Sequence, residues 1–454
     1  TNNYQLNVAC YADGPDTTPP RVYEWTTGPT NFIKIYTPTS AGEVGISQRH
    51  NGVLNGSQGY VLDMNTGTLG WGIELINANH VWLDGLQFDM RDNEFAAIEI
   101  CDGCTAPGGL LAGGAQIRIS NNIIAGNNGT YSSGLLLAEQ DYVEFYAWNN
   151  IIYGWTGSYN GYGITISARN GSNTYPRAIY NNTIYGCRNG ISVGTDAGIV
   201  IAKNNIVVGS GDTNSYIGVF AAGTDYNATD SNDAIGQGSN NRTGQAFSFV
   251  GAGNYHLQDS DVGAKNFGTD LSADAVISFA NDIDGQARPD ITSWDIGADE
   301  AYDVTAPTII DATLYDTDAD GYIDQILVEF SEDIDDASFG AASQFTFGGT
   351  ACTGVATGAS ANDEFITLTT DDTTVFGTGL NAVTFTAAAD TFEDGSGNDT
   401  ATTATITEID AAGPVLMDVH AEDLGTAGVF NAVGERMDLY FSEILNDDLS
   451  PLLS

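Results

Sequence analysis

Hydrophobic and polar residues alternate along much of this chain, in short stretches that are separated by Gly, Asn, Asp, Ser and Thr. A period of two residues is typical of a half-buried β-strand. The abundance of turn-forming residues, together with the scarcity of Lys, Met and Glu/Lys-rich stretches, indicates few helices. The pattern therefore predicts an all-β protein.

One short phrase with a central Asn pair recurs four times, and an alternating apolar stretch precedes each copy. Asn tolerates left-handed backbone angles and can bond its own main chain, so an Asn pair between two short strands predicts a tight corner. Repeats at irregular but similar spacing predict a parallel β-solenoid with loops of variable length and an Asn ladder at the corners. The copies are SNNIIAG at 120–126, WNNIIYG at 148–154, YNNTIYG at 180–186 and KNNIVVG at 203–209.

These phrases resemble the right-handed parallel β-helix of secreted bacterial proteins, the pectate-lyase-like superfamily. The segments NYHLQ at 254–258 and DIDGQARPDITSWDIGADE at 282–300 look like the closing segment of extracellular bacterial β-helix proteins. The resemblance implies a parallel β-helix over residues 1–302. With about ten turns at a strand spacing of about 4.8 Å, we expect a rod about 50 Å long.

After Glu300 the Asn phrases end, and alternating stretches such as 364–370 and 382–388 are spaced like the strands of a β-sandwich. Residues 303–411 resemble bacterial Ig-like surface domains, with their phrases A-P-x-I, V-x-F-S-E and D-x-x-G-N. The segment 412–454 repeats the opening phrases and predicts the start of a second, incomplete Ig-like domain. Half a sandwich would expose apolar edges, so either the natural chain continues or a neighbouring molecule supplies the missing strands.

The acidic phrase DTDADGYID at 316–324 carries the most specific chemical pattern. Side-chain oxygens at positions 1, 3, 5 and 9 and a main-chain carbonyl at position 7, with Gly at position 6, form the Ca²⁺ loop of helix-loop-helix sites. Here the flanks are strands, so the pattern predicts a calcium loop on a β-hairpin. The predicted ligands are Asp316, Asp318, Asp320, Tyr322 and Asp324.

Position 12 of this loop is Leu327 where a bidentate Glu is expected, so a further ligand must come from elsewhere. Asp311, Glu332 and Asp333 are the candidates. The alternative is an acidic hairpin turn without an ion. The second copy has lost most of these acids, which predicts no equivalent site there.

The chain has 454 residues and a net charge of -46, with 59 acidic against 13 basic residues. Such a surface makes nucleic acid and anionic membranes poor partners, because both are bound through Lys and Arg. No apolar run reaches the roughly 20 residues that cross a bilayer, which predicts no membrane insertion. The first residue is Thr1, so we expect the numbering to start at a mature, processed end of an extracellular or cell-surface protein.

The cysteines Cys101 and Cys104 form a single C-x-x-C, which indicates a loop disulfide or two buried thiols rather than a zinc site. An aromatic cluster, YNGYG at 159–163 with Trp148 and Trp155, either stacks on sugar rings or covers a loop.

Catalytic phrases of β-helix enzymes are absent from the sequence. Lyases need a Lys or Arg base with neutralising cations, yet the three lysines stand alone and no R-x-P-x-x-R, G-H-G or R-x-K phrase occurs. The sequence does not exclude a pair of carboxylates at the separation that glycosidases require. We therefore expect no enzyme, with a polysaccharide lyase or glycoside hydrolase as the alternative. The four histidines also show no spacing that predicts a triad or metal trio; they are His50, His80, His256 and His420.

The hypothesis that accounts for most features is an extracellular structural or adhesive surface protein with calcium-stabilised modules. It would act as a homo-oligomer or polymer through its domain ends, assemble into a filament or surface array, and have a glycan or cell-surface partner. The alternative is a secreted β-helix that binds or cleaves polysaccharide.

Overall fold

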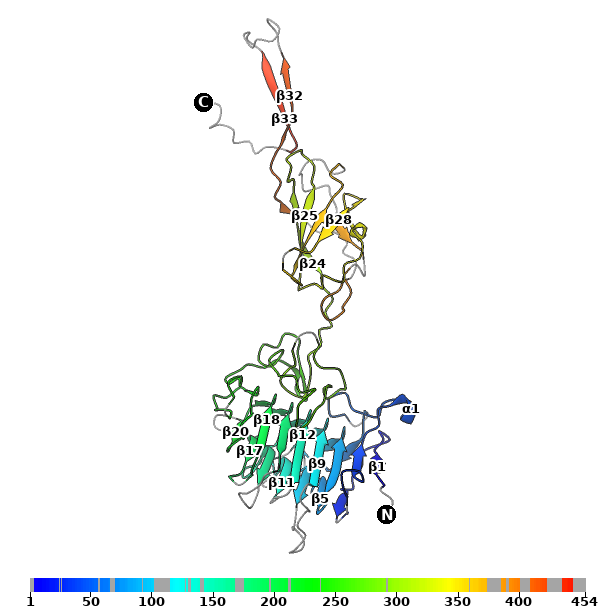
Figure 1. Ribbon diagram of the computed structural model, residues 1–454, viewed down its shortest axis with the longest axis vertical. Helices are drawn as coiled ribbons and strands as arrows, with labels where there is room; N and C mark the ends of the chain where they lie inside the picture. The colour runs from blue at the N-terminus through cyan, green and yellow to red at the C-terminus, as the bar shows by residue number, and fades with distance from the viewer. Residues whose placement is uncertain are drawn as a thin grey trace. The chain divides into compact units, whose positions relative to one another are not determined.

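The computed structural model describes most of the chain, and it divides into two units, Thr1–Tyr302 and Asp303–Ser454, which are described separately (Figure 1). The described residues are 4–23, 25, 27–55, 58–65, 70–91, 93–101, 115–126, 128–129, 132–138, 143–167, 175–195, 197–210, 214–236, 238–290, 293–358, 360–373, 385–388, 392–400, 409–422 and 435–443.

The first unit is built from three parallel seven-stranded sheets, A, B and C, which the chain visits in turn as in a parallel β-helix. Sheet A contains β1 (Leu6–Ala9), β3 (Ile33–Tyr36), β6 (His80–Asp84), β9 (Ala115–Ser120), β12 (Val143–Trp148), β15 (Arg177–Tyr180) and β18 (Val200–Lys203). Sheet B contains β4 (Val61–Asp63), β7 (Gln87–Asp89), β10 (Ile123–Ala125), β13 (Ile151–Tyr153), β16 (Thr183–Tyr185), β19 (Ile206–Val208) and β21 (Ala228–Thr229). Sheet C contains β2 (Arg21–Tyr23), β5 (Ile73–Ile76), β8 (Ile98–Cys101), β11 (Ser133–Ala138), β14 (Tyr162–Ser167), β17 (Asn189–Val193) and β20 (Tyr216–Ile217).

The alternating pattern places every second side chain inside the coil. In β9, Ile117 and Ile119 are buried while Gln116 and Arg118 are only partly covered. The in-register pairing stacks each inward residue on its counterpart in the next coil, so that Ile119 lies between Leu83 and Ala147. Because each fully buried aliphatic side chain stabilises the fold by about 1.5–3 kcal/mol, these columns are the main source of stability.

Among the described residues each sheet has seven strands, which corresponds to seven coils rather than the ten expected from sequence. Seven strands at about 4.8 Å span about 29 Å from first to last. The expectation was too high because the chain leaves the coil after Arg242, which forms a last parallel bridge to β21. They form the hairpin β22 (Phe249–Gly251) and β23 (Asn254–Leu257) and irregular segments packed on the outer faces of sheets A and B. One short helix, α1 (Ala41–Val44), lies in an earlier loop.

The Asn pairs form the corners between sheets A and B on neighbouring coils, which confirms that part of the sequence prediction. The first Asn of each pair has positive φ, as the tight corner requires; these are Asn121, Asn149, Asn181 and Asn204. The second Asn points inward, and each side-chain amide donates to the Oδ1 of the next Asn at 2.8–3.1 Å. This ladder runs through Asn122, Asn150, Asn182, Asn205, Asn227 and Asn241.

The first Asn of three pairs has a second role, because its amide holds the segment that closes the unit. Asn149 donates to Asn281 O at 2.7 Å, Asn181 to Gly297 O at 3.0 Å, and Asn204 to Thr269 O at 2.8 Å. The corner therefore organises the coil on one side and the closing segment, residues 268–301, on the other.

The second unit contains a five-stranded and a three-stranded sheet around a separate hydrophobic core that runs from Ile309 to Phe392. The first sheet has the order β28 (Gly354–Ala356), β29 (Phe365–Thr369), β25 (Gln325–Phe330), β24 (Ile309–Tyr315) and β31 (Ile409–Asp410). The second has the order β27 (Thr350–Ala351), β26 (Phe345–Phe347) and β30 (Phe385–Ala387), and the 3₁₀ turn η1 (Ala342–Gln344) precedes β26.

A second hairpin, β32 (Leu416–Glu422) with β33 (Arg436–Phe441), repeats the β24–β25 hairpin in detail. Both pairs shift register after their first residue. In both, a Ser hydroxyl accepts a main-chain N–H from the start of the hairpin, from Thr308 to Ser331 and from Val415 to Ser442. The sequence repeat therefore encodes the same local structure twice.

Candidate functional sites

Three residues of the predicted calcium loop lie together at the turn between β24 and β25. Oxygen atoms of Asp316, Asp318 and Asp320 come within 4.8 Å of one another. Asp316 accepts N–H groups from Ala319 and Gly321, at 2.7 and 2.9 Å, so the loop backbone wraps around its carboxylate. Asp318 and Asp320 are exposed and Asp316 is partly buried, as the ligands of a surface calcium loop would be.

The other two predicted ligands, Asp324 and Tyr322, are not part of this group of three. Asp324 lies outside this group of three and accepts hydrogen bonds from the main chain and the hydroxyl of Thr317. The N–H of Tyr322 donates to Asp320 at 2.9 Å, which closes the turn. Calcium binding by the five residues stays a prediction.

A carboxylate that the sequence did not single out completes the acidic cluster. Asp372 follows β29, which pairs with β25, and its Oδ1 is buried without a hydrogen-bond partner among the described residues. Desolvation and then the charges of the loop raise the pKa of Asp372, with Asp320 and Asp318 the largest contributors. The Asp371-Asp372 pair directly after a strand is the signal that could have pointed to it.

The expected sources of the missing calcium ligand lie elsewhere in two cases, which corrects the sequence analysis. Glu332 groups with Asp303 and Asp394, whose ligand atoms lie within 4.8 Å of one another. The pKa of Asp333 is raised by burial and then by Glu364 and Asp363. Strand β25 starts at the loop and Glu332 and Asp333 follow its far end, whereas Gln325 at its start pairs with Thr369, shortly before Asp372.

In the first unit, the acids of the closing segment mainly serve the main chain. Asp282 accepts N–H groups from Asp284 and Gln286, at 3.0 and 2.8 Å. Glu300 accepts the N–H of Asp295 and forms a fully buried ion pair with Arg288 at 2.8 Å. The acidic phrases at 282–300 are thus explained by the need to satisfy buried donors.

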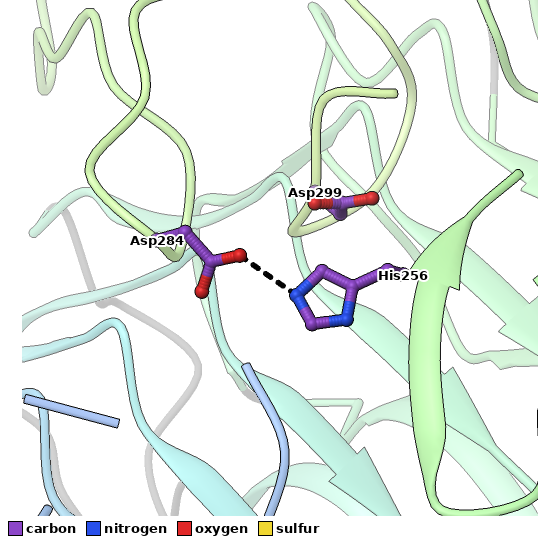
Figure 2. Close-up of side chains that lie close together, drawn as sticks. All are labelled: His256, Asp284 and Asp299. Carbon is purple, nitrogen blue, oxygen red and sulfur yellow. Dashed lines mark hydrogen bonds and ion pairs between the residues drawn. The ribbon is translucent and has the colours of Figure 1, made fainter. Parts of the chain in front are cut away.

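Two acidic side chains of this segment, those of Asp284 and Asp299, lie beside the ring of His256 (Figure 2). His256 Nε2 lies 2.8 Å from Asp284 Oδ2, and Asp299 lies beside the same ring. Asp299 is 3% exposed and accepts the N–H of Leu257 at 2.7 Å. The spacing of the histidines in the sequence did not indicate this cluster, in which ligand atoms of His256, Asp284 and Asp299 lie within 4.8 Å of one another.

The charges of this trio are strongly coupled. Burial lowers the pKa of His256, but the hydrogen bond to Asp284 and the charge of Asp299 outweigh it and raise the pKa to about 8. Burial raises the pKa of Asp299 well above its ordinary value, although His256 opposes this. The trio therefore needs positive charge to remain ionised.

A pocket of about 200 Å³ opens on the outer face of sheet A, where the closing segment leaves the sheet uncovered. The guanidinium of Arg118 lies 4.4 Å from the ring of Trp82, and among the described residues Arg118 makes no ion pair. Lys34 and Arg49 both approach Asp84, at 3.7 and 2.8 Å. The lining residues are Lys34, Trp82, Asp84, Arg118, Ser120, Asn121 and Trp148.

The aromatic cluster around 159–163 separates in the structure. Trp155 is fully buried in the coil interior, so it cannot stack on a sugar, whereas Trp148 lines the pocket on sheet A. Of the C-x-x-C pair, Cys101 takes part in a disulfide and Cys104 lies outside the described residues.

Comparison of the chain with models of known protein families, with curated proteins and with solved structures found no match in any of the three. Within the described residues, no helix has the length and apolar character needed to cross a bilayer.

Proposed function

We propose that this chain is an extracellular structural or adhesive surface protein, in which a rigid β-helix of the pectate-lyase-like type carries Ig-like modules stabilised by calcium. The observation that carries the proposal is the continuous Asn ladder beside columns of stacked aliphatic residues. Neighbouring coils stack similar side chains on one another, so the unit maintains a shape along its axis. Rigid shape is what a spacer or an array subunit requires.

Self-assembly is the form of this function that the exposed strands favour. β1 is the edge strand of sheet A, and its Leu6 and Val8 are 42% and 39% exposed. An edge strand presents free N–H and C=O groups to another chain. A head-to-tail contact that does not close would build a filament.

Calcium has two roles in the proposal. Bound at Asp316, Asp318 and Asp320, with Asp372 as an additional ligand, it would neutralise carboxylates that otherwise repel one another. On the outer surface, divalent ions would bridge molecules whose net charge of -46 keeps them apart.

Electron microscopy of the full chain, with calcium and with EGTA, tests this function. The proposal predicts regular filaments or sheets in calcium and their loss in EGTA. Dispersed particles that release reducing or unsaturated sugars from polysaccharide would overturn it in favour of an enzyme.

Polysaccharide binding or cleavage is the second candidate, and the pocket on sheet A favours it. Arg118, Lys34 and Trp148 line a space suited to one sugar ring, in a chain with only 13 basic residues. Affinity electrophoresis in acidic and neutral polysaccharides would test it. Retardation that Arg118→Ala abolishes and Arg188→Ala leaves unchanged would support binding at this pocket; no retardation would reject it.

A further inference from the structure

The orientation of the His256 ring is fixed by Asn254. The side-chain oxygen of Asn254 accepts the main-chain N–H of His256 at 3.2 Å, which identifies this atom as the amide oxygen. The same oxygen contacts His256 Nδ1, so Nδ1 carries a hydrogen. In the neutral ring, Nε2 then presents its lone pair to Asp284.

Two hydrogen-bond acceptors therefore face each other across 2.8 Å, at His256 Nε2 and Asp284 Oδ2. At this hydrogen-bond distance the contact requires a second ring proton, on Nε2, and a metal ion bound by both atoms would replace that proton. Asp299 adds a second carboxylate that is almost completely buried. One proton would balance one of the two negative charges, whereas a divalent ion balances both.

The unused atoms at the site also favour a metal ion. Asp284 Oδ1 is buried and makes no hydrogen bond within the described part of the chain. A carboxylate that binds a metal can use either oxygen, and a proton on Nε2 would leave this atom without a partner. The remaining contacts resemble the outer shell of a metal site, since Asn254 orients the His ring and Leu257 N–H bonds Asp299.

We propose that His256, Asp284 and Asp299 bind one Zn²⁺ ion, which fastens the closing segment of the β-helix. An imidazole nitrogen with two carboxylates suits Zn²⁺ and related first-row divalent ions. Ca²⁺ takes oxygen ligands, so the trio differs in kind from the acidic loop of the second unit.

The position of the site explains what the ion would do. His256 lies on β23, Asp284 in the turn after Asp282, and Asp299 near the end of the unit, so the ion would join three segments that pack on sheets A and B. Gly52, with φ of 74°, brings an earlier loop against the ring, and a Cβ there would overlap His256 Nε2.

The test is calorimetric titration of the zinc-free full chain with ZnCl2, in excess Ca²⁺ that occupies the general acidic surface. We expect one tight equivalent of Zn²⁺ in the wild type. Its affinity should fall at least tenfold in His256→Gln and Asp284→Asn. His420→Gln and Asp270→Asn, which remove an exposed imidazole and an exposed carboxylate elsewhere, should leave it unchanged.

Unaltered Zn²⁺ affinity in both site variants, or no tight equivalent in the wild type, would overturn the proposal. X-ray absorption at the zinc edge of the wild type gives a readout that does not depend on the variants folding. The proposal predicts a shell of oxygen with one imidazole nitrogen, and a shell of oxygen alone would contradict it.

Discussion

The two units of this chain differ in what holds them together. The β-helix has one continuous core from Val22 to Ile235, and its coils from Asn122 to Asn241 are linked by an Asn ladder that needs no ion. The second unit has a smaller core, and four acidic side chains of one turn lie close to Asp372. Stacking lets a chain gain stability with each added coil, whereas in our proposal the small two-sheet unit with crowded carboxylates is stabilised by a bound cation. The comparison predicts that a given mutation or ion changes the stability of one unit and leaves that of the other unchanged.

The largest effect is expected from Asn182→Ala, within the ladder. Asn182 Oδ1 accepts the N–H and the side-chain amide of Asn150, and its own amide donates to Asn205 Oδ1. Since each buried polar group without a partner costs about 1–3 kcal/mol, we expect a loss of about 4 kcal/mol in the unfolding free energy of the first unit. Calorimetric scanning would resolve it from the second unit.

The matched control for this prediction is Asn232→Ala, because Asn232 is exposed. It should change the free energy of unfolding by less than about 0.5 kcal/mol. Equal effects of the two substitutions would show that the ladder adds no stability.

A pH effect on the first unit is expected from His50, which is 3% exposed. Burial, and then the charge of Arg49, lower its pKa to about 4, although Asn121, Asp284 and Asp84 oppose the shift. The folded state thus favours the neutral ring, so this contribution is complete above the unfolded pKa of about 6.5 and is lost as the pH falls toward 4. The loss should be about 3 kcal/mol.

Denaturant unfolding of wild type and His50→Gln between pH 7 and pH 4 measures this contribution. The wild type should lose more stability than the variant, since Gln does not titrate. A constant difference between the two proteins across this range would contradict the assignment.

The next effect concerns calcium and the second unit alone. At a free calcium concentration 100 times the dissociation constant, binding to the folded state adds about 2.7 kcal/mol of stability. Asp320→Asn should remove most of this gain, while Asp336→Asn, outside the loop, should retain it. Thermal scans in calcium and in EGTA would show the difference, and an unchanged melting temperature of the second unit in EGTA would reject the calcium loop.

The smallest effect is expected for the surface ion pair of Arg21 and Glu74, which joins neighbouring strands of sheet C. The Arg21 side chain is 51% exposed, so solvent screens the pair and Arg21→Ala should cost between about 0 and 1 kcal/mol. The difference should vanish in high salt. A larger cost would mean that surface ion pairs, in addition to the stacked interior, stabilise the contact between coils.

The periodic part of the fold could be predicted because its information is local. The phrases with Asn150 and Asn182 repeat the same corner, and alternation fixes which residues face inward. The number of coils could not be predicted, since described residues from Phe247 to Ala301 pack on the outside through non-repeating contacts. Arg177 also escaped prediction, as it is fully buried in a column between Phe145 and Val200.

The candidate sites divide in the same way. Asp316, Asp318 and Asp320 follow one another within a turn, so their spacing was enough to bring them together. His256, Asp284 and Asp299 lie far apart in sequence and meet only because the closing segment folds over sheet B. No periodic pattern in the sequence predicts contacts between such segments, which is why the spacing of the histidines did not indicate this cluster.

Hydrogen exchange measured on the full chain in calcium and in EGTA tests the contrast between the two units most directly. Strands β9, β12 and β15 should keep the same protection in both conditions, because stacking and the Asn ladder hold them. Strands β24, β25 and β29 should lose protection in EGTA. Equal loss in both units, or no loss in either, would contradict the account.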